Sequence, residues 1–147
     1  MGQLTLDWDP SNPLDPGPCI DVIVMNSLEV LQGWRESGLE CPEPLKLRAL
    51  LDTGASFSII SKTFAKYCKL FQTGVGEVRA LGAVHVCGEH AGAISFPGSN
   101  LRSVESIRLR SADFVQERYY ACLIGRDILQ NWTITLDGRS KKVTIVD

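Results

Sequence analysis

The sequence has no long apolar run, no excess of charge of one sign and no signal-like leader, and each absence excludes a class of protein. No window of its 147 residues approaches 18 uninterrupted apolar positions, so we expect no membrane span. The 15 Lys and Arg stand against 17 Asp and Glu, a net charge of −2, which argues against a large basic nucleic-acid face. The N-terminus lacks the basic and apolar regions of a secretory signal. We therefore expect a cytoplasmic protein whose partners include neither membrane nor nucleic acid.

The five cysteines are widely spaced, odd in number and without a Cys-x-x-Cys pair. Two interpretations are open: buried thiols in a reducing compartment, or one or two disulfides that leave an orphan thiol. His85, Cys87 and His90 lie close together in the sequence, but a zinc site needs three or four converging ligands and no fourth is near. We expect neither a metal nor an organic cofactor.

The chain does contain short apolar and β-branched segments separated by glycine and proline, at a length typical of one domain. Residues 1–18 carry four prolines and predict an extended arm outside any regular ladder, followed by a domain over 19–147. Strands are expected at 19–25, 45–51, within 73–97, 104–109 and 118–124, and in a closing hairpin of 133–136 and 141–146. Helices are expected within 26–44, which we interpret as an insertion, after Ser61 as N-cap, and at 127–132. This pattern predicts a mainly β barrel with a few short helices.

The most informative segment is residues 49–56, Ala-Leu-Leu-Asp-Thr-Gly-Ala-Ser. Asp52 directly follows an apolar strand, where the core would normally continue, and Gly54 lets the backbone turn sharply. Ala55 and Ser56 keep the surroundings small. This is the geometry of a carboxylate held at the floor of a cleft by backbone and hydroxyl donors. An Asp that ends a strand and caps its own turn is the alternative interpretation.

This segment resembles the active-site loop of the retropepsin-like aspartic peptidases. Residues 122–129, Cys-Leu-Ile-Gly-Arg-Asp-Ile-Leu, are similar to the second signature of that family, an apolar strand followed by Gly125, Arg126 and Asp127. The two motifs stand in the order that the family has, and the resemblance covers residues 19–147. It implies a closed acid-protease barrel in which the Gly-Arg-Asp segment supports the active-site loop.

The resemblance also implies a mechanism in which two carboxylates share a proton and activate a water molecule. Aspartic proteases are the standard case of this chemistry: like charges about 3 Å apart cannot both ionise cheaply, so one carboxyl is the acid and its twin the base. Asp52 would be the catalytic carboxylate, because Asp127 is structural in the family and Asp137 lies in a hairpin turn. The second carboxylate would come from another copy, in a two-fold homodimer that hydrolyses a polypeptide. Thr53 would bond to the counterpart loop and Gly54 would contact the substrate.

Two features follow from the resemblance less directly. In viral members the Arg of the second motif pairs with an Asp four residues after the catalytic one. Ser56 stands at that position here, so Arg126 is expected to bond Ser56, a backbone carbonyl or Asp127. A flap that closes over the substrate is expected within residues 79–92, with a rigid surface hairpin as the alternative. The flap residues nearest the substrate would be Ala83, Val84, His85 and Val86.

Two other functions stay open. A catalytically silent dimerisation or peptide-binding module would have the same fold, and it would keep its behaviour when Asp52 is replaced by Asn. A metal-dependent hydrolase that uses His85 and His90 would lose its activity with a chelator.

Overall fold

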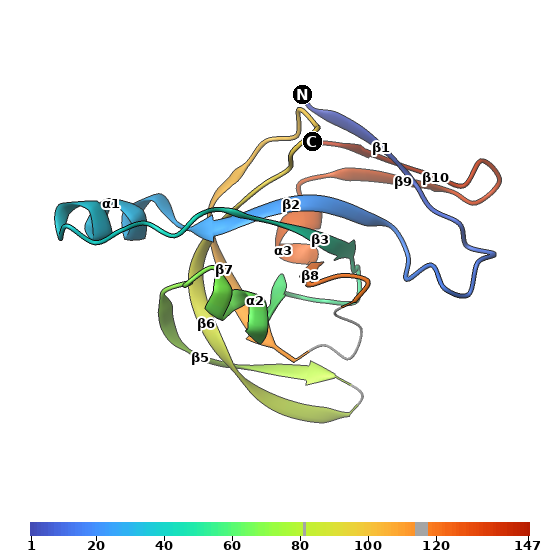
Figure 1. Ribbon diagram of the computed structural model, residues 1–147. Helices are drawn as coiled ribbons and strands as arrows, with labels where there is room; N and C mark the ends of the chain where they lie inside the picture. The colour runs from blue at the N-terminus through green and yellow to red at the C-terminus, as the bar shows by residue number, and fades with distance from the viewer. Residues whose placement is uncertain (81, 114–117) are drawn as a thin grey trace.

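The computed structural model describes residues 1–80, 82–113 and 118–147 and is mainly β, with 47% strand and 13% helix (Figure 1). In chain order its elements are β1 (Gln3–Asp7), β2 (Cys19–Asn26), α1 (Leu28–Glu36), β3 (Leu45–Leu51), β4 (Ile59–Ser61), α2 (Lys62–Tyr67), β5 (Gln72–Ala80), β6 (Ala83–Ser95), β7 (Val104–Ala112), β8 (Cys122–Ile124), α3 (Arg126–Leu129), β9 (Thr133–Asp137) and β10 (Lys142–Val146).

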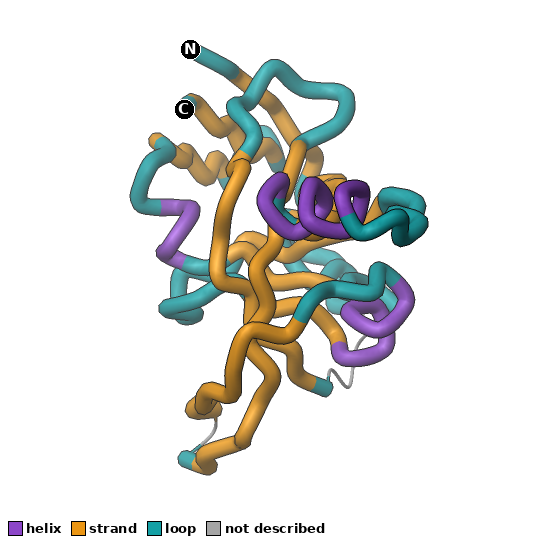
Figure 2. Tube along the Cα trace, turned by 90° about the vertical axis from the view of Figure 1, so that its left-hand side faces the viewer, coloured by secondary structure: helices purple, strands orange, loops and turns teal. Residues whose placement is uncertain are grey.

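Six strands close into a barrel, as the sequence predicts. Their order is β2-β3-β8-β4-β7-β6, and β2 also pairs with β6, from Ile23 opposite Ser95 to Asn26 opposite Gly92. Among the described strands β5 pairs with β6 alone, and this β5–β6 hairpin projects from the barrel in both views (Figures 1 and 2). The core consists of apolar side chains, and those that are 2% exposed or less are Ile20, Val22, Val24, Ala49, Ile60, Cys68, Ile94, Leu109, Cys122, Ile124, Ile128, Val143 and Ile145.

The N-terminal segment corrects one expectation. Residues 3–7 are not outside the ladders: they form β1, which pairs antiparallel with β10 in a three-stranded sheet of order β1-β10-β9. Leu4 and Leu6 alternate with polar residues and pack against the core, opposite Ile145 and Val143. The four prolines begin only at Pro10, so they interrupt the chain after this strand and not within it.

The helices agree with expectation in place and differ in length. α1 lies in the predicted insertion and projects from the barrel (Figure 1). Ser61 caps α2, and its Oγ accepts a hydrogen bond from the backbone N–H of Phe64 at 3.5 Å.

The strand predicted over 118–124 is shorter in the structure than in the prediction. β8 has three residues, Cys122–Ile124, which pair with Ala49–Leu51 of β3. Among the described residues, no helix has the length and apolar character that a membrane crossing requires.

The five cysteines are all free thiols, four of them buried and Cys41 half-buried. This confirms the first of the two interpretations, free thiols in place of disulfides.

Candidate active site

The two sequence motifs meet because the strands that precede them are parallel neighbours. Leu51 at the end of β3 lies opposite Ile124 at the end of β8. Asp52 and Gly125 therefore leave the sheet side by side, and the backbone N–H of Asp52 donates to the carbonyl of Ile124 at 2.9 Å. The parallel register thus places the second motif beside the loop of residues 52–58, which we call the Asp52 loop.

A backbone N–H of the Asp52 loop binds the carboxylate of the same loop. Asp52 is half-buried, and its Oδ1 accepts a hydrogen bond from the backbone N–H of Gly54 at 2.9 Å. Its carbonyl accepts a second bond, from the N–H of Ala55 at 3.2 Å. Thr53 and Gly54 are exposed at the tip. The loop therefore presents an oriented carboxylate next to an exposed turn. The bond from Gly54 is also the one that an Asp capping its own turn makes, so the cleft geometry predicted for Asp52 and Gly54 stays a prediction.

Arg126 holds this loop with three hydrogen bonds. They show which of the three expected partners it binds: Ser56, a backbone carbonyl or Asp127. Its Nη1 donates to the carbonyl of Thr53 and its Nη2 to the Oγ of Ser56, each at 2.8 Å. Its backbone N–H donates to the carbonyl of Ala55 at 2.8 Å. Arg126 therefore binds a side-chain hydroxyl and backbone carbonyls, two of the three kinds of partner expected for it, while Asp127 binds elsewhere.

Asp127 binds Ser58, a residue that the sequence analysis did not single out. Oδ2 of Asp127 accepts from the backbone N–H of Ser58 at 2.9 Å, and Oδ1 accepts from the Oγ of Ser58 at 2.8 Å. Ser58 is fully buried, and its Oγ also accepts from the N–H of Gly125 at 3.1 Å. A serine in the otherwise apolar run 57–60 is the only signal that the sequence offers for this role.

The contact between the two motifs leaves no space for a side chain at Gly125. A Cβ there would lie 2.6 Å from the carbonyl carbon and oxygen of Phe57. The glycine of the second motif is therefore required by the close approach of two backbones.

Tyr120 is a second residue that the sequence analysis did not assign to the site. Its pKa is raised, first by burial and then by the negative charge of Asp52. Tyr120 stands two residues before β8.

The predicted flap residues lie near the tip of the β5–β6 hairpin. Val84 and Val86 are opposite Arg79 and Glu77, and they are 52% and 68% exposed. Ala83 and His85 are exposed as well. The hairpin is longer than residues 79–92, because its pairing begins at Gln72, and residue 81 of its turn lies outside the described residues. Flap motion over a substrate stays a prediction.

The two histidines of the metal hypothesis are separated along β6. His85 is exposed near the tip, whereas His90 is buried in the stem, about 17 Å away at the usual rise of a strand. The ring of His90 is hydrogen-bonded to the carbonyl of Leu70 at 3.3 Å and to the Oγ of Ser111 at 3.0 Å. Within the described ranges, no three His, Cys, Asp or Glu side chains are grouped as a metal ion would require.

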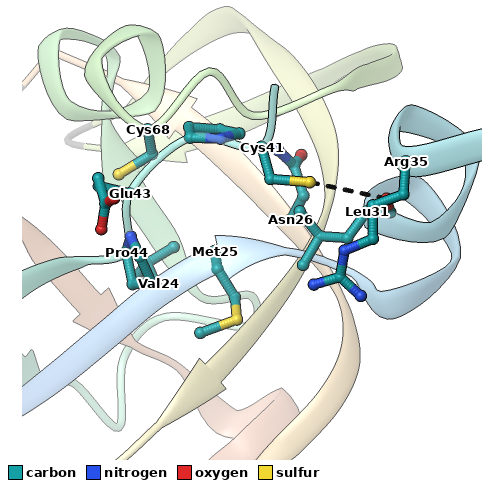
Figure 3. Close-up of a pocket in the computed structure, with 10 residues that line it drawn as sticks. Val24, Met25, Asn26, Leu31, Arg35, Cys41, Glu43, Pro44 and Cys68 are labelled. Atoms are coloured by element: carbon teal, nitrogen blue, oxygen red, sulfur yellow. Dashed lines mark hydrogen bonds between the residues drawn. The ribbon is translucent and has the colours of Figure 1, made fainter. Parts of the chain in front are cut away.

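A pocket of about 290 Å³ lies away from Asp52, between α1, β2 and the segment before β3 (Figure 3). Arg35 and Glu43 supply its charged groups, and Cys41 donates weakly from its Sγ to the carbonyl of Leu31 at 3.8 Å. None of the residues of the Asp52 loop lines this pocket.

Comparison with known proteins supports the fold through structure and not through sequence. No protein-family model matches the chain, and no curated protein matches it by sequence. Among solved structures it is similar to a retropepsin-like aspartic protease from Rickettsia conorii, with a TM-score of 0.60 and 11% identity over 99% of this chain and 91% of that one. The fold is retropepsin-like. At this identity the similarity concerns the fold alone, so the activity depends on what the residues of the site can do.

Proposed function

We propose that the chain is an aspartic endopeptidase that acts as a homodimer, with Asp52 of each copy as its catalytic carboxylate. One observation carries the proposal: within a retropepsin-like fold, the Asp52 loop presents an oriented, half-buried carboxylate beside an exposed turn. The substrate would be an extended polypeptide held between the two loops and the β5–β6 hairpins.

The other two candidate acids of the chain are engaged elsewhere, which supports a site shared between two copies. The carboxylate of Asp127 accepts three hydrogen bonds, from Ser58 twice and from the N–H of Ile128. Asp137 accepts from the backbone N–H groups of residues 139 and 140, in the turn between β9 and β10. A two-fold axis beside Asp52 would supply the second carboxylate from an identical loop.

Peptide hydrolysis in such a site needs only the two carboxyl groups and a water molecule. The ionised Asp52 takes a proton from the water, whose oxygen attacks the peptide carbonyl carbon. The protonated Asp52 of the other copy gives its proton to the carbonyl oxygen, which forms a tetrahedral diol. The carboxyl that took the water's proton then gives it to the nitrogen while the other carboxylate takes a proton from a hydroxyl of the diol, and the C–N bond breaks to leave a carboxyl group and an amine. The pKa values that govern this exchange belong to the pair.

The test is digestion of a peptide library at several pH values, with and without pepstatin. Asp52→Asn should lower kcat by at least about 100-fold, because general acid–base catalysis contributes about 10²–10⁴-fold. Asp21→Asn is the matched control, since this exposed carboxylate pairs only with Lys46 on the barrel surface among the described residues. Cleavage that persists in Asp52→Asn would refute the proposal, and peptide binding without cleavage by the wild type would identify a silent module instead.

Mixing wild-type chains with Asp52→Asn chains tests whether two copies share one active site. A tenfold excess of Asp52→Asn chains should capture wild-type chains in mixed dimers and lower the cleavage rate about tenfold by mass action. An unchanged rate would mean that each chain works alone.

A further inference from the structure

Arg110 of β7 contacts both parts of the proposed site, the Asp52 loop and the β5–β6 hairpin. Its guanidinium carbon lies 3.9 Å from the centre of the Phe57 ring in the Asp52 loop. Its Nη2 lies 3.3 Å from Oε1 of Glu89 on β6, and its Nη1 donates to the carbonyl of Glu77 on β5. One planar cation thus joins three segments that are distant in the sequence.

This ion pair is shielded from water, unlike the other ion pairs of the described chain. The side chains of Arg110 and Glu89 are 15% and 16% exposed, so salt screens their attraction little. Arg108 also approaches Glu89, at 3.9 Å, but its side chain is 66% exposed. Glu89 therefore has one half-buried partner and one exposed partner on the same strand.

The backbone of β5 is shaped to admit the Glu89 carboxylate. A Cβ at Gly76 would lie 2.5 Å from Oε1 of Glu89, so any side chain there would displace the carboxylate. Glu89 consequently lies across the neighbouring strand and reaches Arg110.

Arg110 is also held at the Asp52 loop by contacts of the backbone. The backbone N–H of Arg110 donates to the carbonyl of Ser58 at 3.2 Å, and Ser58 is held by Asp127. Phe57, on which the guanidinium stacks, is in backbone contact with Gly125. A continuous set of contacts therefore runs from the second motif through Arg110 to the stem of the hairpin.

We propose that Arg110 is a positioning residue that fixes the stem of the β5–β6 hairpin relative to the Asp52 loop, and that it thereby sets where residues 83–86 lie above the carboxylates. This inference rests on the proposed peptidase function. A lysine cannot replace Arg110, because it lacks the planar group that stacks on Phe57 while its nitrogens reach Glu77 and Glu89.

The test compares Arg110→Lys with Arg108→Lys, the same change on the same strand toward the same carboxylate. Arg110→Lys should lower kcat/KM about tenfold, mostly through a higher KM, because the hairpin would no longer be held in place for binding. Arg108→Lys should leave both constants at the wild-type value. If Arg110→Lys fails to fold, Phe57→Leu removes only the ring under the guanidinium and should raise KM in the same direction.

Hydrogen exchange gives a readout that does not need activity. Backbone amides of residues 83–88 should exchange faster in Arg110→Lys than in Arg108→Lys, while those of β2 and β3 should not change. A lower melting temperature with wild-type kcat/KM and wild-type exchange in the hairpin would overturn the inference, because Arg110 would then only stabilise the fold. If the wild type cleaves no peptide, the proposed function fails, and the exchange comparison still decides whether Arg110 fixes the hairpin.

Discussion

Ser58→Ala is the most demanding test of how the Asp52 loop is held. The change removes one oxygen atom from a fully buried side chain and alters no charge. That oxygen donates to Oδ1 of Asp127 at 2.8 Å and accepts from the N–H of Gly125 at 3.1 Å. A half-buried carboxylate and a buried backbone N–H therefore lose a partner together.

The magnitude follows from the two lost hydrogen bonds. A hydrogen bond to a charged group contributes about 1.5–3 kcal/mol, and a buried N–H left without a partner costs about 1–3 kcal/mol. Asp127 keeps the N–H of Ile128 and the backbone N–H of residue 58, so the two terms do not add fully. We expect the free energy of unfolding to fall by about 3 kcal/mol. For a chain of this length, that corresponds to a melting temperature lower by about 6–12 °C.

Thermal and urea unfolding at one fixed protein concentration measure this loss, since association would make stability depend on concentration. Ser56→Ala is the matched control: it lies two residues earlier, is exposed, and loses only its bond to Nη2 of Arg126 at 2.8 Å. An exposed bond of this kind contributes about 1 kcal/mol at most. Equal losses for the two alanine variants, or a loss under about 1 kcal/mol for Ser58→Ala, would refute the role we give to Ser58.

Two further predictions concern buried titratable groups. Burial lowers the pKa of His90 from its ordinary 6.5, so between the two pKa values the unfolded chain binds more protons than the folded one. The free energy of unfolding should therefore fall as the pH drops below about 6.5, and urea midpoints of His90→Gln should lack this part of the pH dependence. Burial raises the pKa of the Cys68 thiol to about 11 and that of Cys122 to about 12. Iodoacetamide at pH 8 should therefore label half-buried Cys41 first, and mass spectrometry that finds Cys122 labelled as fast would contradict this.

Elements whose signal is local could be predicted from the sequence. The closing hairpin has alternating strands around a turn that contains Asp137, and the structure pairs them as β9 and β10. β1 was missed, because its partner β10 stands at the other end of the chain and only the proline-rich segment after it is conspicuous. β8 was predicted too long, because aromatic residues such as Tyr119 favour strands while its ladder with β3 spans only three residues.

The residues of the candidate site also differ in whether the sequence gives a local signal for them. Asp52 and the Gly125–Asp127 segment are short continuous motifs, so the sequence alone indicated them. Ser58 sits in an apolar run, and its bond to Asp127 spans 69 positions of sequence. Arg110 looks like an ordinary polar residue of an alternating strand, and only the fold brings Glu89 and Phe57 to it. Roles that depend on such distant partners carry no local signal.

Residues of its own chain hold the Asp52 loop in place, and this bears on the proposed dimer. The loop is hydrogen-bonded to three residues at the end of β8 and in α3: Ile124, Arg126 and Asp127. The backbone N–H of Gly54, in the loop itself, orients the carboxylate of Asp52. A second copy would therefore meet a loop that is already ordered, and association would not have to supply the conformational entropy of ordering it. What each copy would gain from the other is a carboxylate. Preorganisation of this kind also suits the chemistry, because two carboxylates that repel each other can share a proton only if neither is able to move away.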